Sequence, residues 1–205
     1  MFSVRTQQEA KREFTGPFRA FTVHSYFTQD VDLVVMTSTY GQETLKNFLT
    51  QKDSAFYTRA AKSPGATYRV LFYKLLGFRR SCKVDVLVPG TMDIPLIASH
   101  RILRINDIPV MPIIALLLLK LQGWSDHRAS TRLDMQEKQY VDVRDINQLL
   151  QFAVDRGESV QEATWLPESF VEAGQERLNK YLTTIRPVSA SSWSDIGFDT
   201  SALDS

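Results

Sequence analysis

The stretch "QDVDLVVMTS", residues 29–38, places Asp30 and Asp32 one residue apart at the start of an otherwise apolar run. The β-branched residues that follow predict a strand from Val31 to Met36. Because side chains two residues apart in a strand share a face, both carboxylates lie on one face and the apolar residues on the other. Two adjacent carboxylates repel each other unless a cation lies between them. The pattern indicates a cation site or, in the simpler interpretation, a solvated strand edge or a capping aspartate.

A second apolar run is interrupted in the same way. In "CKVDVLVPG", residues 82–90, Asp85 stands between Val84 and Val86. If this strand and the first are neighbours in one sheet, three carboxylates converge. Hard divalent cations such as Mg²⁺ prefer oxygen ligands, and a pair of them about 3.5 to 4 Å apart is typical of displacement at phosphorus. The three acids therefore predict a site for Mg²⁺ or Mn²⁺.

The segments around these strands predict an α/β (α+β) fold with a mixed sheet flanked by helices. Gly41 precedes a helical pattern with Leu45, Phe48 and Leu49 on one face. Three strand-like runs, divided by turn residues, and a short later strand complete the sheet elements. They span residues 55–61, 67–75, 82–90 and 102–105.

The rest of the chain predicts helices. Residues 112–124 are apolar on every face, which is typical of a buried helix. Further helices are expected at 135–157 and 167–185, and weaker ones at 5–13 and 18–26. We expect an α/β core over residues 1–108, a helical C-terminal part packed on it over 109–186 and a flexible tail over 187–205.

Whole-chain properties narrow the environment and the partners. The sequence has 205 residues, with 24 basic and 23 acidic ones, so its formal net charge of +1 attracts neither nucleic acid nor an anionic membrane over a distance. A single cysteine, Cys82, and the absence of a charged and then apolar leader favour a reducing, cytoplasmic location. The longest apolar stretch, residues 110–119, is far shorter than the roughly 20 residues of a membrane span.

Taken together, Thr28-x-Asp30-x-Asp32, the helix after it and the strand with Asp85 resemble the nucleotidyltransferase fold of the DNA polymerase beta superfamily. The later helix with Lys120 and the segment "KQYVDVRDINQLL" are similar to the small minimal and abortive-infection nucleotidyltransferases. The similarity covers residues 16–155, and "LLLLKLQGWSDHR" is also similar to a stretch of fungal proteins.

The resemblance implies transfer of a nucleotidyl group from a nucleoside triphosphate to an acceptor, which is RNA, a protein or a small molecule. Chemistry would be in-line attack at the α-phosphate, with Mg²⁺ or Mn²⁺ as the cofactor and no membrane partner. The implied catalytic and metal-binding residues are Asp30, Asp32 and Asp85, the nucleotide-binding residues are Gly16, Thr28 and Lys120, and Asp142 and Asp145 would support them from behind.

One part of the family pattern is altered. The phosphate-binding turn that precedes the first acid corresponds here to "FTGPFRAF", residues 14–21, where Gly16 is suitably placed but Pro17 lacks a backbone donor. Two alternatives follow. The chain is a catalytically degenerate interaction module, or it is a toxin-like domain that modifies a macromolecule bound along the Arg79 to Arg104 side.

Several remaining features have simpler interpretations. Asp142 and Lys138 lie four residues apart and would form an ordinary surface ion pair. The aromatic runs in 55–61 and 70–78 predict core and sheet packing more than a base-stacking platform. The three histidines and Cys82 lack the spacing of a zinc site. The basic residues near the third strand would hold a triphosphate or a nucleic-acid acceptor, or lie in a solvated loop: Arg79, Arg80, Lys83, Arg101 and Arg104.

Overall fold

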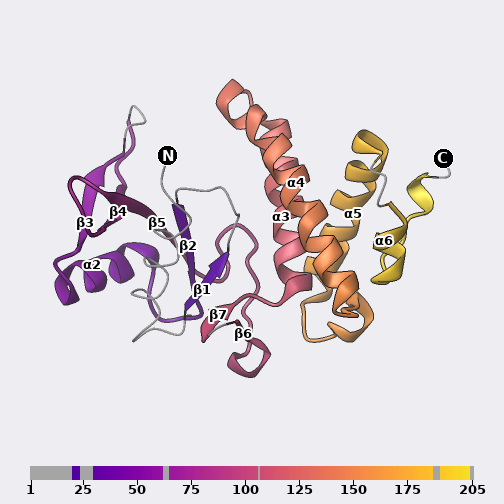
Figure 1. The fold of residues 1–205 in the computed structure, drawn as a ribbon, viewed down its shortest axis with the longest axis horizontal. Helices are drawn as coiled ribbons and strands as arrows, with labels where there is room; N and C mark the ends of the chain where they lie inside the picture. Colours follow the sequence, from indigo (N-terminus) through magenta and orange to yellow (C-terminus); the bar gives the residue numbers. More distant parts are fainter. Residues whose placement is uncertain (1–19, 24–29, 62–64, 106, 187–189, 204–205) are drawn as a thin grey trace. The chain divides into compact units, whose positions relative to one another are not determined.

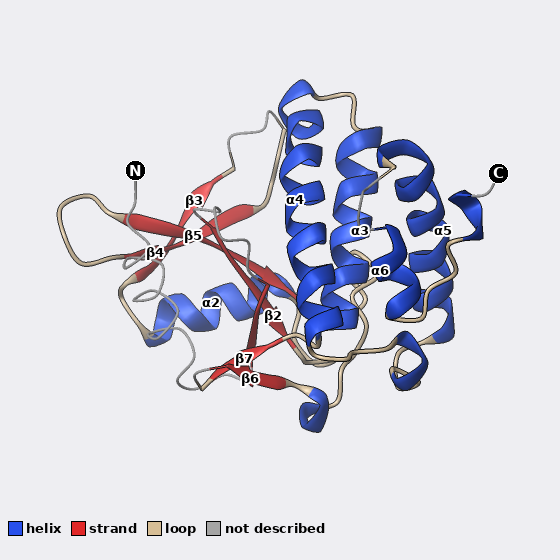
Figure 2. Cartoon of the chain, turned by 45° about the vertical axis from the view of Figure 1, so that its right-hand side comes forward, coloured by secondary structure: helices blue, strands red, loops and turns tan. Residues whose placement is uncertain are grey.

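The computed structural model describes residues 20–23, 30–61, 65–105, 107–186 and 190–203. The chain divides into two compact units, Met1–Met111 and Pro112–Ser205, close to the boundary expected at residue 108. The first unit is built on a sheet and the second consists of helices (Figures 1 and 2). The α+β class predicted from the sequence is confirmed.

A five-stranded mixed sheet forms the centre of the first unit, in the order β1-β2-β5-β4-β3. Strands β2 and β5 are parallel, and the other neighbouring pairs are antiparallel. The mixed sheet is therefore confirmed. Its strands are β1 (Ala20–Val23), β2 (Asp30–Val35), β3 (Phe56–Ala60), β4 (Arg69–Lys74) and β5 (Ser81–Leu87).

Strand β1 replaces a predicted helix. Residues 20–23, expected within a helix over 18–26, pair antiparallel with β2, so that Val23 lies opposite Asp32. Without this pairing the outer edge of β2 would leave its backbone N–H and C=O groups without sheet partners. Phenylalanine and valine also favour strands, so sheet pairing prevails over a weak helical preference. The helix predicted at 5–13 lies outside the described residues.

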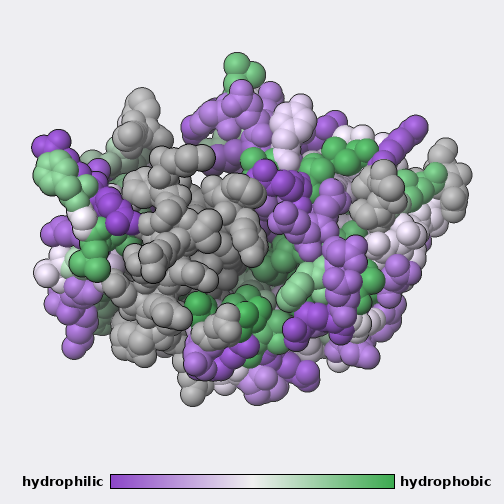
Figure 3. All heavy atoms as spheres, viewed as in Figure 1, coloured by the Kyte–Doolittle hydropathy of each residue, from purple (hydrophilic) through white to green (hydrophobic). Residues whose placement is uncertain are grey.

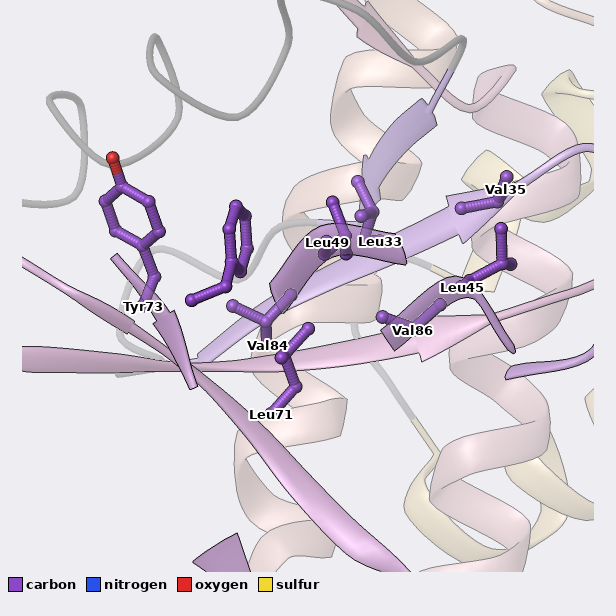
Figure 4. Packing of buried hydrophobic residues seen from close by; sticks show 9 residues of the cluster. Leu33, Val35, Leu45, Leu49, Leu71, Tyr73, Val84 and Val86 are labelled. Atoms are coloured by element: carbon purple, nitrogen blue, oxygen red, sulfur yellow. The ribbon is translucent and has the colours of Figure 1, made fainter. Parts of the chain in front are cut away.

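Helix α2 (Gln42–Lys52) supplies the apolar cover for one face of the sheet. Its Leu45 and Leu49 are four residues apart, hence on one side of the helix, and both are buried against residues of the strands (Figure 4). Phe48 was predicted on the same face, but it is 38% exposed and packs edge-on against Tyr40 instead. The other residues of this core are Leu33, Val35, Phe56, Leu71, Tyr73, Val84 and Val86.

The segment after β5 contains a short 3-10 helix, Ser99–Arg101, and a second, two-stranded sheet. Strand β6 (Leu103–Ile105) was predicted, whereas β7 (Ile108–Val110) was not. β7 is three residues long and contains Pro109. Proline has no backbone N–H to donate, so it argues against a strand when only the sequence is read. The strand lies next to β1.

Three long helices make up most of the second unit: α3 (Ile113–Ala129), α4 (Leu133–Asp155) and α5 (Glu168–Ile185). All three were predicted. Helix α3 packs against both α4 and α5, which explains why apolar residues surround it. Hydrophilic residues predominate over the helices in the view of Figure 3, with smaller hydrophobic areas between them. Within the described part of the chain, no helix combines the length and apolar character needed to cross a membrane.

Helices α3 and α5 approach each other closely at Gly174 of α5. A Cβ atom built on Gly174 would lie 2.5 Å from Cδ2 of Leu118, whose side chain is fully buried. By contrast, nothing lies within 4 Å of a Cβ built on Gly123, in the middle of α3. The glycine in α5 is therefore a packing requirement, and the one in α3 is not.

Residues 190–203 are structured, contrary to the prediction of a flexible tail over 187–205. Residues 190–195 form α6 (Ala190–Asp195), and a short 3-10 helix covers Ser201–Leu203, like the earlier Val160–Glu162. Trp193 is 0% exposed and packs edge-on against Tyr181 and Phe198. The abundance of serine and aspartate in this segment concealed a few apolar residues that are buried, so the prediction is wrong for residues 190–203.

Candidate functional site

The two acid-bearing strands are neighbours. β2 and β5 run parallel, with Asp32 opposite Asp85 and Asp30 opposite Lys83. In both strands the residues alternate, so these four side chains share the face that points away from α2, while Val31, Leu33, Val84 and Val86 share the other. The adjacency on which the predicted site depends is therefore present, and it comes from the crossover through α2, β3 and β4.

Lys83 lies between two of the acids. Its Nζ atom is 3.5 Å from Oδ2 of Asp30, and it donates a short hydrogen bond to Oδ2 of Asp85. All three side chains are between one third and one half exposed. The ammonium of Lys83 thus bridges the first acid strand and the second.

The ionisation of Lys83 follows from this arrangement. Burial on its own lowers the pKa of the amine, but the hydrogen bond to Asp85 and the charges of Asp85 and Asp30 outweigh burial and raise the pKa above its ordinary value of 10.5. Lys83 is therefore a cation at neutral pH.

We call the sheet face that carries Asp30, Asp32, Lys83 and Asp85 the acid face. Its side chains have the right chemistry for a divalent cation, but their present positions do not enclose one. Carboxylate oxygens are the ligands that Mg²⁺ and Mn²⁺ prefer. Among the residues that the structure describes, however, no three aspartate, glutamate, histidine or cysteine side chains are close enough together to hold a metal ion. Three carboxylates and one ammonium leave a formal net charge of −2, which one divalent ion balances and a pair of them exceeds.

On the core side of the same strand, Cys82 is a buried free thiol. Burial, followed by the negative charge of Asp30, raises the pKa of Cys82 from 9.0 to about 11. The thiol is therefore protonated at neutral pH and is a poor nucleophile and a poor metal ligand.

Two residues predicted to bind the nucleotide, Gly16 and Thr28, lie outside the described residues. The third, Lys120, belongs to α3 in the helical unit. Its Nζ atom donates a 2.9 Å hydrogen bond to Oδ2 of Asp145 on α4, whose side chain is 5% exposed. A cation within an apolar helix is costly unless it meets a carboxylate, which is the requirement that Asp145 fulfils.

Asp142, one turn before Asp145, has a different partner from the one expected. It is buried, and its Oδ2 lies 2.6 Å from Nδ1 of His127, in the last turn of α3. Lys138, predicted to pair with Asp142 at the surface, is exposed. The surface pair is therefore wrong, because Asp142 faces α3 and joins the two helices.

The role of Lys83 was missed. The sequence interpretation placed it among basic residues that flank the third strand, although its position two residues before Asp85 in "CKVDV" already puts it on the acid face. What the sequence leaves open is the register, which sets Lys83 opposite Asp30.

Comparison with known proteins assigns no role to these residues. No protein-family model matches the chain, and neither a curated protein nor a solved structure matches it.

Proposed function

We propose that the chain is a metal-dependent nucleotidyltransferase-like protein that transfers a nucleotidyl group from a nucleoside triphosphate to an acceptor. The observation that carries the proposal is the placement of Asp32 opposite Asp85 on adjacent parallel strands, on the sheet face that points away from α2. Carboxylates at neighbouring positions are suited to a hard cation, which would in turn draw a triphosphate.

In this proposal Asp32 and Asp85 hold one divalent ion, and Asp30 contributes through its charge and through Lys83. The formal charge of −2 on the face favours a single ion. When bound, the ion supplies charge neutralisation at the phosphates. Without the ion, Lys83 neutralises part of the acid face. Its partly exposed ammonium is able to turn toward a phosphate, since a lysine side chain has four flexible carbons.

The test is calorimetric binding of each of the four nucleoside triphosphates, with Mg²⁺ or Mn²⁺, to the wild type and to Asp32→Asn. We expect metal-dependent binding to the wild type and a loss of at least about tenfold in the variant, because one anionic ligand is removed. Asp126→Asn, an exposed aspartate of α3, is the matched control and should bind as the wild type does. Equal affinity of Asp32→Asn and wild type, with the fold intact by circular dichroism, contradicts the proposal.

A second candidate is supported by the ammonium of Lys83. A lysine that bridges Asp30 and Asp85 provides the positive charge that a metal ion would otherwise provide. The acid face would then be a structural remnant, and the chain an interaction module without catalysis. This candidate predicts that neither the wild type nor any acid variant binds a triphosphate at millimolar Mg²⁺, and the same calorimetry distinguishes the two.

A further inference from the structure

Strands β3 and β4 and the first residues of β5 come from a segment with an unusual distribution of charge. Between Asp53 and Asp85 the chain contains no acidic residue, yet it carries seven basic ones. The near-zero net charge of the whole chain conceals this local excess. We call residues 54–84 the acid-free segment; its basic residues are Arg59, Lys62, Arg69, Lys74, Arg79, Arg80 and Lys83.

Part of this charge lies over aromatic rings. Tyr57 on β3 and Phe72 on β4 are cross-strand partners whose rings stack, with centroids 5.7 Å apart and planes inclined by 21°. They lie on the sheet face opposite the core, and both are partly exposed. The guanidinium of exposed Arg59 is 5.1 Å and 5.0 Å from the two ring centroids, and Nζ of Lys74 is 5.7 Å from that of Tyr57.

The hairpin between β4 and β5 continues the pattern. Phe78 is 86% exposed at its tip, and the guanidinium of Arg79 lies 5.0 Å from the ring centroid. The tip is held by a tight turn in which Gly77 and Arg79 have φ angles of 103° and 54°, and Arg80 donates a hydrogen bond to the carbonyl of Leu76. The exposed ring is therefore presented by a fixed turn.

The sequence interpretation of these aromatic runs, core and sheet packing, holds for the strand residues, although they divide between the two faces of the sheet. Phe56 and Tyr73 are core residues, as expected, whereas Tyr57, Phe72 and Phe78 are turned away from the core. Alternation along the strands separates the two sets. The outward set is the one with cations beside it.

Alternating rings and cations are suited to one kind of partner. Single-stranded nucleic acid has an anionic backbone and flat bases that stack on aromatic rings or on guanidinium planes. The centre of a protein interface is depleted of charged residues, whereas here cations lie against the rings themselves. A membrane-inserting tip would use Phe78 and Leu76 but leave the ring pair of Tyr57 and Phe72 without a role.

We propose that the acid-free segment binds single-stranded nucleic acid, with bases stacked at Phe78 and at the Tyr57–Phe72 pair and phosphates contacted by Lys74 and Arg79. The idea that this surface holds the acceptor of the reaction rests on the proposed nucleotidyl transfer. Its role as a binding surface does not, since none of the residues proposed to contact the nucleic acid is Asp30, Asp32, Lys83 or Asp85, although Phe72 lies beside Lys83 on the same sheet face.

The test is fluorescence anisotropy of a labelled oligouridine of about 16 nucleotides with the full chain, without metal or triphosphate, between about 50 and 200 mM salt. The slope of log K against log salt is negative, and each lost phosphate contact on a single strand reduces its magnitude by about 0.7. We expect Lys74→Gln/Arg79→Gln to reduce the magnitude of the slope by about 1.4. Phe78→Ala should weaken binding about tenfold and leave the slope unchanged.

Matched controls come from the helical unit. Lys138→Gln/Lys180→Gln removes the same charge from exposed positions, and Tyr140→Ala removes a ring that is 74% exposed. Both should bind as the wild type does. Asp32→Asn should also bind the oligonucleotide normally, so that a failure of the nucleotidyl-transfer proposal can be told apart from a failure of the binding proposal. Equal losses in the controls, or no binding by the wild type at about 50 mM salt, overturn the proposal. Binding to phosphatidylserine vesicles but not to oligouridine or oligothymidine also overturns it, in favour of a membrane surface.

Discussion

Lys120 and Asp145 join α3 to α4 through a 2.9 Å hydrogen bond between an ammonium that is 18% exposed and a carboxylate that is 5% exposed. Removing one partner of such a pair leaves a charge in a poorly solvated place. Lys120→Met should therefore lower the free energy of unfolding by about 3 kcal/mol, measured by urea denaturation followed by circular dichroism.

Two further variants separate this effect from lost packing. Arg132→Met breaks a pair with Asp134 in which both side chains are more than half exposed, and it should cost less than about 1 kcal/mol. The double variant Lys120→Met/Asp145→Leu should recover most of the loss because neither charge of the pair remains in the poorly solvated site. A cost for Lys120→Met as small as that of Arg132→Met would show that the buried pair is not required for stability.

Lys83→Gln tests whether the acid face holds a metal ion. The substitution removes the cation between Asp30 and Asp85 and changes the formal charge of the face from −2 to −3. Mn²⁺ should then bind at least about fivefold more tightly, an effect on the order of 1 kcal/mol. The measurement is electron paramagnetic resonance of free Mn²⁺.

The control for this variant is Lys52→Gln, at the exposed end of α2 in the same unit. It should leave Mn²⁺ binding unchanged. Because the ion pairs of Lys83 are more than one third exposed, the fold itself should lose under about 1 kcal/mol in Lys83→Gln. Unaltered Mn²⁺ affinity in a folded Lys83→Gln would mean that the three acids do not act together on a cation.

Cys82 predicts a pH dependence of reactivity and of stability. Its pKa is about 11 in the folded chain, against an ordinary value of 9.0. At pH 8.5, iodoacetamide should therefore modify the folded protein about a hundredfold more slowly than the urea-unfolded chain, because the reactive form is the thiolate. Mass spectrometry follows the modification directly, since Cys82 is the single cysteine of the chain.

The same shift links Cys82 to alkaline unfolding. A pKa raised by folding contributes stability that is fully present below pH 9 and is lost as the pH rises toward 11, by about 1.4 kcal/mol for each pH unit. The difference in unfolding free energy between wild type and Cys82→Ala should therefore change over this window and stay constant below it. A difference that does not vary with pH from 8 to 11 would contradict the buried, protonated thiol.

Gly174 and Gly123 form a matched pair of helical glycines. Alanine at position 174 must displace Leu118, and such overpacking costs typically about 1 to 3 kcal/mol, more than the gain in helix propensity of about 1 kcal/mol. Gly123→Ala receives the same gain without a contact and should stabilise the helical unit by about 0.5 to 1 kcal/mol. Thermal unfolding of both variants measures this opposite response, and a stabilised Gly174→Ala would mean that α5 is free to move away from α3.

Much of the fold was predictable because it follows from periodicity. The alternation of Asp30 to Val35 and of Cys82 to Val88 predicted the two strands, and the leucines of 42–52 predicted the helix between them along the chain. Alternation also placed the acids on a common face, and the actual pairing then set Asp32 opposite Asp85. The local sequence pattern was sufficient to predict a helix or strand wherever one side of that element is apolar.

The parts that were not predictable depend on register and on distant partners. Lys83 bridges two strands only because the parallel pairing sets it opposite Asp30. Likewise, Asp142 meets His127 because of how two helices pack, and its spacing from Lys138 carried no information about that. The ordered C-terminal helix depends on one tryptophan among serines, a signal too sparse for a composition rule.

The burial of Trp193 has a spectroscopic consequence. All three tryptophans, Trp124, Trp165 and Trp193, belong to the helical unit, and the first and last are essentially unexposed. Intrinsic emission excited at the indole band therefore reports on the helices alone, and it should be blue-shifted because two indoles are out of water. The sheet unit contains no tryptophan and does not contribute to this emission. Its unfolding can be followed separately in the same sample, through the reaction of Cys82 with a thiol reagent.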